Sequence, residues 1–253
     1  VLTGHRYEGD FVDGGRVRVF NGGPSGPDDL TDWELRGKSV SLYVGTFASR
    51  AGDVNTDGYD DLLVSQNNTT GDTSFRGLVS LYLGSFCGLE STPSWTRSGV
   101  FSTESYGYRT TGCGDVNGDG FGDVAIASAR TDTGQPFGRV EVFLGDPGGL
   151  ESEPAFTANG TASDVNLGRG LSTAGDLNLD GFSDLVVGTP NYNTSVGGRA
   201  FVYFGSPTGL EGTPGWATVP DVREDWFGNS VSGGGDVNAD GYSDVIVGLP
   251  KAE

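Results

Sequence analysis

The chain has 253 residues, with 34 acidic and 15 basic side chains and a formal net charge of −19. This balance, with no evident basic patch, argues against nucleic acid as a partner. No apolar run approaches the length that spans a bilayer, and the 45 glycines suit a fold with many chain reversals.

The predicted elements recur in a fixed order along the chain. Residues 1–4 (VLTG) match 245–248 (VIVG), and RVRVFNG from Arg16 alternates apolar and polar residues as a strand does. Each later repeat has a strand, an acidic loop, a short buried apolar run and an alternating strand. A turn and an aromatic residue follow, and we interpret these aromatics as core packing: Trp33, Trp95, Phe156 and Trp216.

The acidic loop is the most regular part of the repeat. It reads GDVNTDGYDD from Gly52, GDVNGDGFGD from Gly114, GDLNLDGFSD from Gly175 and GDVNADGYSD from Gly235. The leading aspartates are separated by 62, 61 and 60 residues. Such a constant, long period predicts a stacked or radial array of one supersecondary unit.

Four strands per repeat predict an all-β fold, a β-propeller of four-stranded antiparallel blades. The chain holds four repeat lengths in a single propeller segment. We expect blades at about residues 40–97, 105–158 and 167–218, with partial blades at 1–36 and 227–253.

The loop chemistry predicts four calcium sites. Counting the leading aspartate as position 1, oxygen donors stand at positions 1, 3, 5 and 9, and position 7 offers its main-chain carbonyl. Glycine at position 6 allows the sharp turn, and a donor set with no His or Cys favours calcium over transition metals. The predicted ligands are Asp53, Asn55, Asp57, Tyr59 and Asp61; Asp115, Asn117, Asp119, Phe121 and Asp123; Asp176, Asn178, Asp180, Phe182 and Asp184; and Asp236, Asn238, Asp240, Tyr242 and Asp244.

The loop differs from an EF-hand at position 12. An EF-hand needs a bidentate Glu there and a helix on each side. This position is apolar in all four copies, within runs such as LLVS and VIVG that predict buried strands: Val64, Ile126, Val187 and Val247. The loop therefore connects two strands.

The last repeat resembles the FG-GAP repeat of integrin α-subunit propellers and of many secreted bacterial proteins. It has Phe227-Gly228, the acidic loop and Gly248-Leu249-Pro250, and the third repeat keeps Leu167-Gly168 and Gly188-Thr189-Pro190. The first two repeats keep the loop but have Ser65-Gln66-Asn67 and Ser128-Ala129-Arg130 in place of the GAP element. The resemblance implies a seven-bladed ring with calcium between the first two strands of a blade, in an extracellular or cell-surface protein.

Both ends of the chain match the second strand of a blade. We therefore expect a segment of a longer polypeptide, with the missing blades supplied by flanking sequence or by a second chain. About three more blades complete a seven-bladed ring, and two such chains would give eight.

The sequence offers no catalytic constellation. The single histidine, His5, lies outside the repeat consensus, and the carboxylates beyond the loops, such as Asp164, have no acid–base spacing. Glu104, in a connection between blades, is expected to contribute little to stability. A disulfide between Cys87 and Cys113 is favoured over two free thiols, because both turns are expected at one face.

The expected function is recognition rather than catalysis. The first candidate is an adhesion propeller that binds a protein through the face opposite the calcium loops. The alternatives are a glycan-binding, lectin-like propeller and the non-catalytic propeller of a larger secreted enzyme. The candidate apolar anchors on the binding face are Phe75, Phe137, Tyr192 and Trp226.

Overall fold

The computed structural model describes residues 2–5, 14–27, 31–37, 43–66, 76–100, 104–128, 137–190, 197–219 and 226–250. Every regular element in these ranges is a β-strand, and all paired strands within a sheet run antiparallel. The predicted all-β fold of four-stranded antiparallel blades is confirmed. No helix able to span a membrane occurs in these ranges.

Three sheets have four strands each. Within a sheet the strands follow chain order, so each blade is a meander. Their strands are β4 (Val44–Gly52), β5 (Asp61–Gln66), β6 (Leu78–Tyr82) and β7 (Trp95–Ser98); β8 (Tyr106–Gly114), β9 (Asp123–Ser128), β10 (Arg139–Phe143) and β13 (Phe156–Asn159); and β14 (Gly170–Gly175), β15 (Asp184–Thr189), β16 (Arg199–Tyr203) and β17 (Trp216–Thr218).

Shorter sheets lie before and after these three. A small hairpin also extends the turn that follows β10. Their strands are β1 (Leu2–His5), β2 (Arg16–Val19) and β3 (Trp33–Arg36); β11 (Gly145–Asp146) and β12 (Gly149–Leu150); and β18 (Ser230–Gly235) and β19 (Asp244–Gly248). β1 pairs with β2 as the second strand of a blade pairs with the third. This agrees with the prediction that residues 1–4 belong to a second strand.

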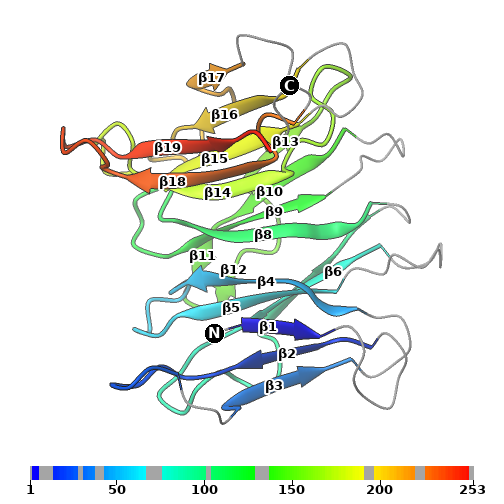
Figure 1. The fold of residues 1–253 in the computed structure, drawn as a ribbon. Helices are drawn as coiled ribbons and strands as arrows, with labels where there is room; N and C mark the ends of the chain where they lie inside the picture. The colour runs from blue at the N-terminus through cyan, green and yellow to red at the C-terminus, as the bar shows by residue number, and fades with distance from the viewer. Residues whose placement is uncertain are drawn as a thin grey trace.

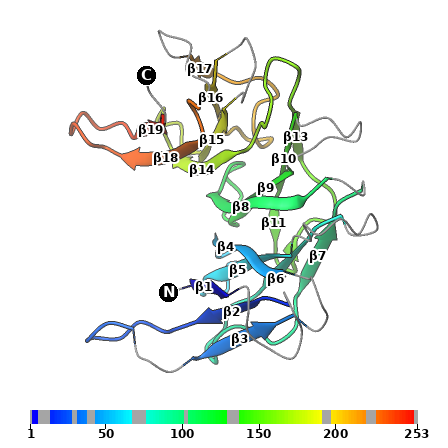
Figure 2. The same cartoon turned by 45° about the vertical axis from the view of Figure 1, so that its right-hand side comes forward.

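The sheets stack in chain order, from blue to red in Figure 1. Figure 2 shows that the stack bends into an arc, with β4, β8 and β14 toward its concave side and β3, β7 and β13 toward its outside. The first strands of successive blades lie against one another. This arrangement is that of consecutive propeller blades; the number of blades in a complete ring stays a prediction.

The core lies between neighbouring blades. The second strands of the three four-stranded blades are almost completely buried because each has a strand on both sides and a blade against both faces. Leu63 and Leu81 of one blade pack in one cluster with Ile126 and Phe143 of the next. Blades of this kind bury their apolar residues only by stacking.

The repeated aromatics belong to this core. Trp33 packs edge-to-face on Tyr82 with ring centroids 5.0 Å apart, Trp95 packs on Phe143 at 5.1 Å, and Phe156 packs on Tyr203 at 5.0 Å. Each pair joins the last strand of one blade to the third strand of the next. Such pairs contribute about 0.5–1.5 kcal/mol beyond their buried area.

Trp216 is the fourth member of this aromatic series. Its side chain is 42% exposed, and no aromatic ring among the described residues packs against it. The interpretation of the aromatics as core packing is thus confirmed for Trp33, Trp95 and Phe156.

Close main-chain contacts also hold the blades together. Gly138 has φ of +79°, and a Cβ at this position would lie 2.2 Å from the carbonyl oxygen of Leu167 in the next blade. Beside it the Leu167 N–H donates to the Phe137 carbonyl at 2.8 Å. Only glycine permits this approach.

The expectation for Glu104 is wrong. Its side chain is fully buried, and its carboxylate accepts the Val100 N–H at 2.7 Å and the Ser128 hydroxyl at 3.0 Å and pairs with Arg139. Val100 belongs to the preceding blade connection, whereas Ser128 and Arg139 belong to β9 and β10. Glu104 therefore ties two blades together, as Asp164 does one repeat later by pairing with Arg199 at 3.2 Å.

The disulfide expectation is also wrong. Both cysteines are free, with Cys87 exposed in the turn after β6 and Cys113 fully buried in β8. Cys113 packs in the apolar cluster between β8 and the following blade, away from the surface turn that holds Cys87.

We predict that Glu104→Ala lowers the free energy of unfolding by about 3–5 kcal/mol, because it removes the closer of the two carboxylates that pair with the Arg139 guanidinium and leaves only Glu141, at 3.6 Å. The double variant Glu104→Leu/Arg139→Leu should recover part of this loss, because it removes the buried guanidinium but leaves the buried Glu141 without its ion pair. One repeat earlier the sequence has Leu42 and Leu78 at the corresponding positions.

Urea unfolding of the single and double variants measures both effects. An unfolding free energy for Glu104→Ala within about 0.5 kcal/mol of the parent, the usual scatter of surface substitutions, would contradict the structural role of the pair.

Candidate metal centre

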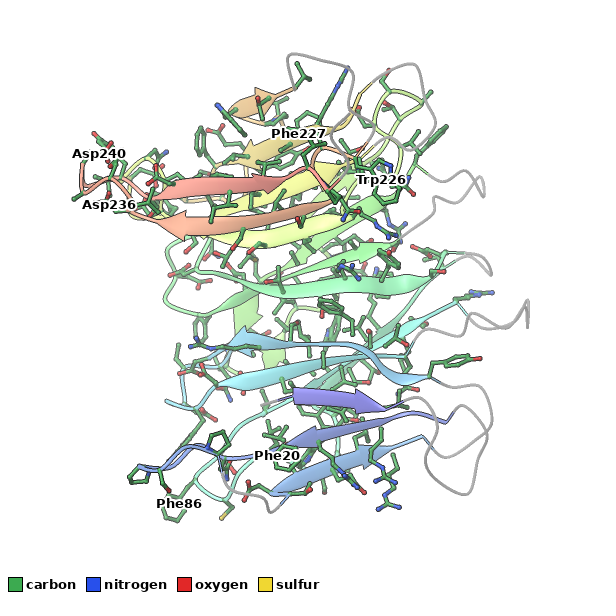
Figure 3. All side chains as sticks on the ribbon, in the orientation of Figure 1. Phe20, Phe86, Trp226, Phe227, Asp236 and Asp240 are labelled. Atoms are coloured by element: carbon green, nitrogen blue, oxygen red, sulfur yellow. The ribbon has the colours of Figure 1, made fainter. Side chains whose placement is uncertain are left out.

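The four acidic loops occupy equivalent places in the blades. They connect β4 to β5, β8 to β9, β14 to β15 and β18 to β19. In Figure 3, Asp236 and Asp240 lie at the tip of the β18–β19 hairpin, and Trp226 and Phe227 lie at the opposite end of β18. We call the end with the acidic loops the acidic face and the other end the opposite face.

The first loop folds around its own side-chain oxygens. Asp53 accepts the N–H of Asp57 at 3.1 Å through Oδ1 and the N–H of Gly58 at 2.9 Å through Oδ2. Asn55 Oδ1 accepts the same Asp57 N–H at 3.2 Å, and Asp57 Oδ1 accepts the Tyr59 N–H at 2.9 Å. Because positions 1 and 3 share one N–H donor, their oxygens lie close together. The other three loops repeat these bonds at Asp115, Asn117 and Asp119, at Asp176, Asn178 and Asp180, and at Asp236, Asn238 and Asp240.

The aspartate at position 9 has a structural role that the sequence analysis did not predict. Asp61 accepts the N–H of Val54 at 2.8 Å through one oxygen and the N–H of Gly84 at 2.8 Å through the other. Gly84 lies after β6, so this carboxylate joins the loop to the turn that leads toward the fourth strand. Asp123 and Asp184 form the same pair of bonds.

Burial makes these carboxylates costly to ionise. Desolvation raises the pKa of Asp123 to about 7, although the N–H groups of Gly145 and Val116 lower it, and the charges of Asp119 and Asp115 raise it further. The pKa values of Asp61 and Asp184 are raised for the same leading reason. A cation beside each loop would offset the cost of burying this negative charge.

The loop backbone is left-handed at two positions. Position 6 is glycine in every copy, with φ between +90° and +96°. Position 4 also has positive φ, although it is glycine only in the second copy: Thr56 at 58°, Gly118 at 76°, Leu179 at 61° and Ala239 at 61°. A β-branched residue such as Thr56 is strained in this conformation.

Adjacent loops are hydrogen-bonded to one another. The Gly122 N–H of the second loop donates to the Asp53 carbonyl of the first at 2.9 Å, and the Ser183 N–H of the third donates to the Asp115 carbonyl at 2.8 Å. The first three acidic loops are therefore joined in a row, in which ordering of one loop supports its neighbour.

The donor set fits a hard cation such as calcium. Counting His, Cys, Asp and Glu alone, no three side chains in the described ranges are close enough to hold a metal ion. The predicted set also contains an asparagine oxygen and a main-chain carbonyl in each loop, and all of its donors are oxygens, as calcium prefers. The structure brings positions 1, 3 and 5 together; ligation of a metal by them and by positions 7 and 9 stays a prediction.

Two of the predicted anchor residues can be placed. Trp226 is 37% exposed and lies on the opposite face, and Phe137 is half-buried between blades beside Leu167. Phe75 and Tyr192 lie outside the described residues. Only the backbone of His5 is described, in β1.

The comparisons with known proteins agree with this geometry. The FG-GAP repeat family model matches residues 167–203 and 227–251. The chain is 33% identical to integrin alpha-5 of Xenopus laevis over 60% of its length, 30% identical to integrin alpha-V of Gallus gallus over 81%, and 26% identical to integrin alpha pat-2 of Caenorhabditis briggsae over 92%. It spans only 15–20% of the length of these relatives. The chain therefore carries FG-GAP repeats and is related to integrin α chains.

We predict that Thr56→Gly raises the free energy of unfolding by up to about 1 kcal/mol. The left-handed penalty that it removes is about 1–2 kcal/mol, and the added entropy of the unfolded chain cancels part of it. Thermal unfolding with and without calcium should show the gain in both conditions; a loss of stability in both would contradict the strain at position 4.

Gly120→Val should have the opposite effect, because Gly120 has φ of +94° and valine resists that conformation. We expect a loss of about 1–2 kcal/mol or more, visible as a lower melting temperature without calcium. Gly212→Val is the control, since Gly212 is exposed, has no positive φ and has open space around its Cβ position. Equal shifts for the two variants would contradict the assigned role of position 6.

Proposed function

We propose that this chain is a calcium-stabilised, extracellular recognition propeller that binds a protein partner through the opposite face. The observation that carries the proposal is the division between the two faces. The acidic face repeats one hydrogen-bonded loop four times, whereas the connections on the opposite face differ in sequence from repeat to repeat.

Calcium in this proposal is structural. Each loop joins the first two strands of a blade, and in the first three loops the position-9 carboxylate also holds the turn after the third strand. A cation that bound the oxygens of positions 1, 3, 5, 7 and 9 would fix three strands at once. Calcium at 100 times its Kd would stabilise the fold by about 2.7 kcal/mol per site.

The relationship to integrin α chains supports a role in adhesion at a cell surface. The chain aligns with only a fifth or less of those proteins, so adhesion is proposed here for the propeller alone. The remaining blades of the ring would come from flanking sequence or a second chain.

We predict that calcium binding stabilises the protein and that Asp119→Asn removes most of the contribution of one site. Asparagine keeps an oxygen that can accept the Phe121 N–H, now 2.9 Å from the Asp119 carboxylate, so the calcium-free fold should be little changed. Calorimetric titration and melting curves with calcium or EDTA measure both effects. A melting curve that EDTA leaves unchanged in the parent protein would overturn the calcium proposal.

We also predict that Trp226→Ala weakens binding to an extracellular-matrix protein by tenfold or more, with an unchanged melting temperature, because exposed tryptophans often dominate interfaces. Phe86→Ala is the matched control: Phe86 is 88% exposed and lies in a turn on the acidic face.

A matrix-protein array and a glycan array identify the ligand for this comparison. If Phe86→Ala abolishes binding and Trp226→Ala does not, the binding face is wrongly assigned. Binding only to glycans, with competition by free sugar, would favour the lectin-like alternative.

A further inference from the structure

A row of arginine and aromatic side chains crosses the blades at the opposite face. Phe47 belongs to β4, Tyr108 and Arg109 belong to β8, and Arg169 immediately precedes β14. All four lie near the starts of the innermost strands, away from the acidic loops at the strand ends. We call these four residues the arginine ladder.

The ladder is held by cation–π contacts. The Arg109 guanidinium lies 5.0 Å from the Phe47 ring centroid and 4.8 Å from that of Tyr108, and the Arg169 guanidinium lies 5.1 Å from the same Tyr108 ring. The Arg169 Nε donates to Asn229 Oδ1 at 3.4 Å, which extends the row toward β18. These contacts are within the range of favourable cation–π pairs, so the side chains are positioned before any partner binds.

Arg109 is unusual among the arginines of this acidic chain. Within the described ranges, no carboxylate lies within ion-pair distance of its guanidinium, whereas Arg97, Arg139 and Arg199 each pair with one. One of its terminal nitrogens donates to the Tyr108 carbonyl at 3.2 Å. Among the described residues, no protein acceptor is found for the other guanidinium nitrogens of Arg109, and its side chain is only half-buried.

Two guanidinium groups lie around one aromatic ring. Arg109 and Arg169 both lie about 5 Å from the centre of the Tyr108 ring, so their charges repel each other. An anion that contacted both would relieve this repulsion. A carboxylate matches the paired N–H groups of a guanidinium with two parallel hydrogen bonds.

The charge of the acidic loops does not cancel this site. Arg109 lies five residues before the end of β8 at Gly114, which at about 3.3 Å per residue separates it from the acidic loop by about 17–20 Å. The Debye length is about 8 Å at physiological ionic strength, so the loop charges are largely screened at that distance. The net charge of −19 still disfavours a polyanion that would cover more of the surface.

We propose that the arginine ladder binds an acidic side chain, Asp or Glu, of a protein partner. The inference rests on the proposed function, because it names the chemistry by which the opposite face recognises that partner. Trp226 is connected to the ladder through Asn229: the Trp226 carbonyl accepts the Asn229 N–H at 3.1 Å, and the Asn229 side chain accepts a hydrogen bond from Arg169. The partner's carboxylate would therefore have an apolar neighbour that packs on Trp226.

The test uses the calcium-loaded chain and two synthetic peptides that differ only in a central Glu or Gln flanked by Leu and Tyr. We expect the Glu peptide to bind about tenfold tighter or more, as for a hydrogen bond between charged groups. Arg109→Gln/Arg169→Gln should abolish the difference. Arg109→Lys keeps the charge but lacks the planar guanidinium, so it should reduce the preference for the Glu peptide. This single variant keeps the test informative if the double variant misfolds.

Arg97→Gln is the matched control, because Arg97 also lies over an aromatic ring, 5.3 Å from the Phe143 centroid, but pairs with Glu153. It should leave the Glu preference intact. Equal binding of the two peptides, no detectable binding at millimolar peptide, or a preference that survives the double variant would overturn the proposal. Tighter binding of a sulfated oligosaccharide than of the Glu peptide would also overturn it.

The outcome can be separated from that of the proposed function. If Trp226→Ala weakens binding to the matrix protein and the peptides show no Glu preference, the binding face stands and only the acidic recognition is wrong. If calcium and Trp226 have no effect while the Glu preference holds, the ladder stands and the proposed function is wrong.

Discussion

Burial of a carboxylate at the start of the second strand of each four-stranded blade is the constraint on which the rest of the blade depends. Asp61, Asp123 and Asp184 are almost completely buried in the described structure. Removing such a charge from water is costly, and two backbone N–H donors compensate only part of that cost. Desolvation raises the pKa of Asp123, which is the direction expected when part of this cost remains uncompensated.

This constraint explains several features of the repeat together. One N–H donor comes from the acidic loop and the other from the glycine after the third strand, so the carboxylate fixes both turns. The same loop then presents oxygens from positions 1, 3 and 5 on one turn. A cation at that turn would stabilise the fold chiefly by neutralising charge that the blade already buries.

Between blades, stability comes from contacts that recur with the repeat. Edge-to-face aromatic pairs join last strands to third strands, loop-to-loop hydrogen bonds join the acidic face, and buried ion pairs join the connections near the opposite face. Each contact involves only neighbouring blades, so stability should be close to a sum over repeats and their interfaces. The opposite face carries the varied connections and can change without disturbing this framework.

The sequence alone determined the features that depend on local pattern and period. The loop spacing, the apolar runs and the alternating segments predicted the strands, their order within a blade and the role of Trp33, Trp95 and Phe156, because these follow from side-chain periodicity. The positions of the candidate ligands in the loop could also be predicted from the sequence, since glycine and aspartate have strong turn preferences.

Only the tertiary structure decided the roles that depend on contacts between distant segments. The sequence predicts Glu104 to be a charged loop residue that contributes little to stability. In the structure, blade packing brings it into contact with Arg139. Cys113 is buried by the neighbouring blade while Cys87 remains exposed, so no disulfide joins them. The left-handed backbone of Thr56 and the stacking of Arg109 between two rings likewise arise from main-chain geometry and blade packing, neither of which a one-dimensional pattern records.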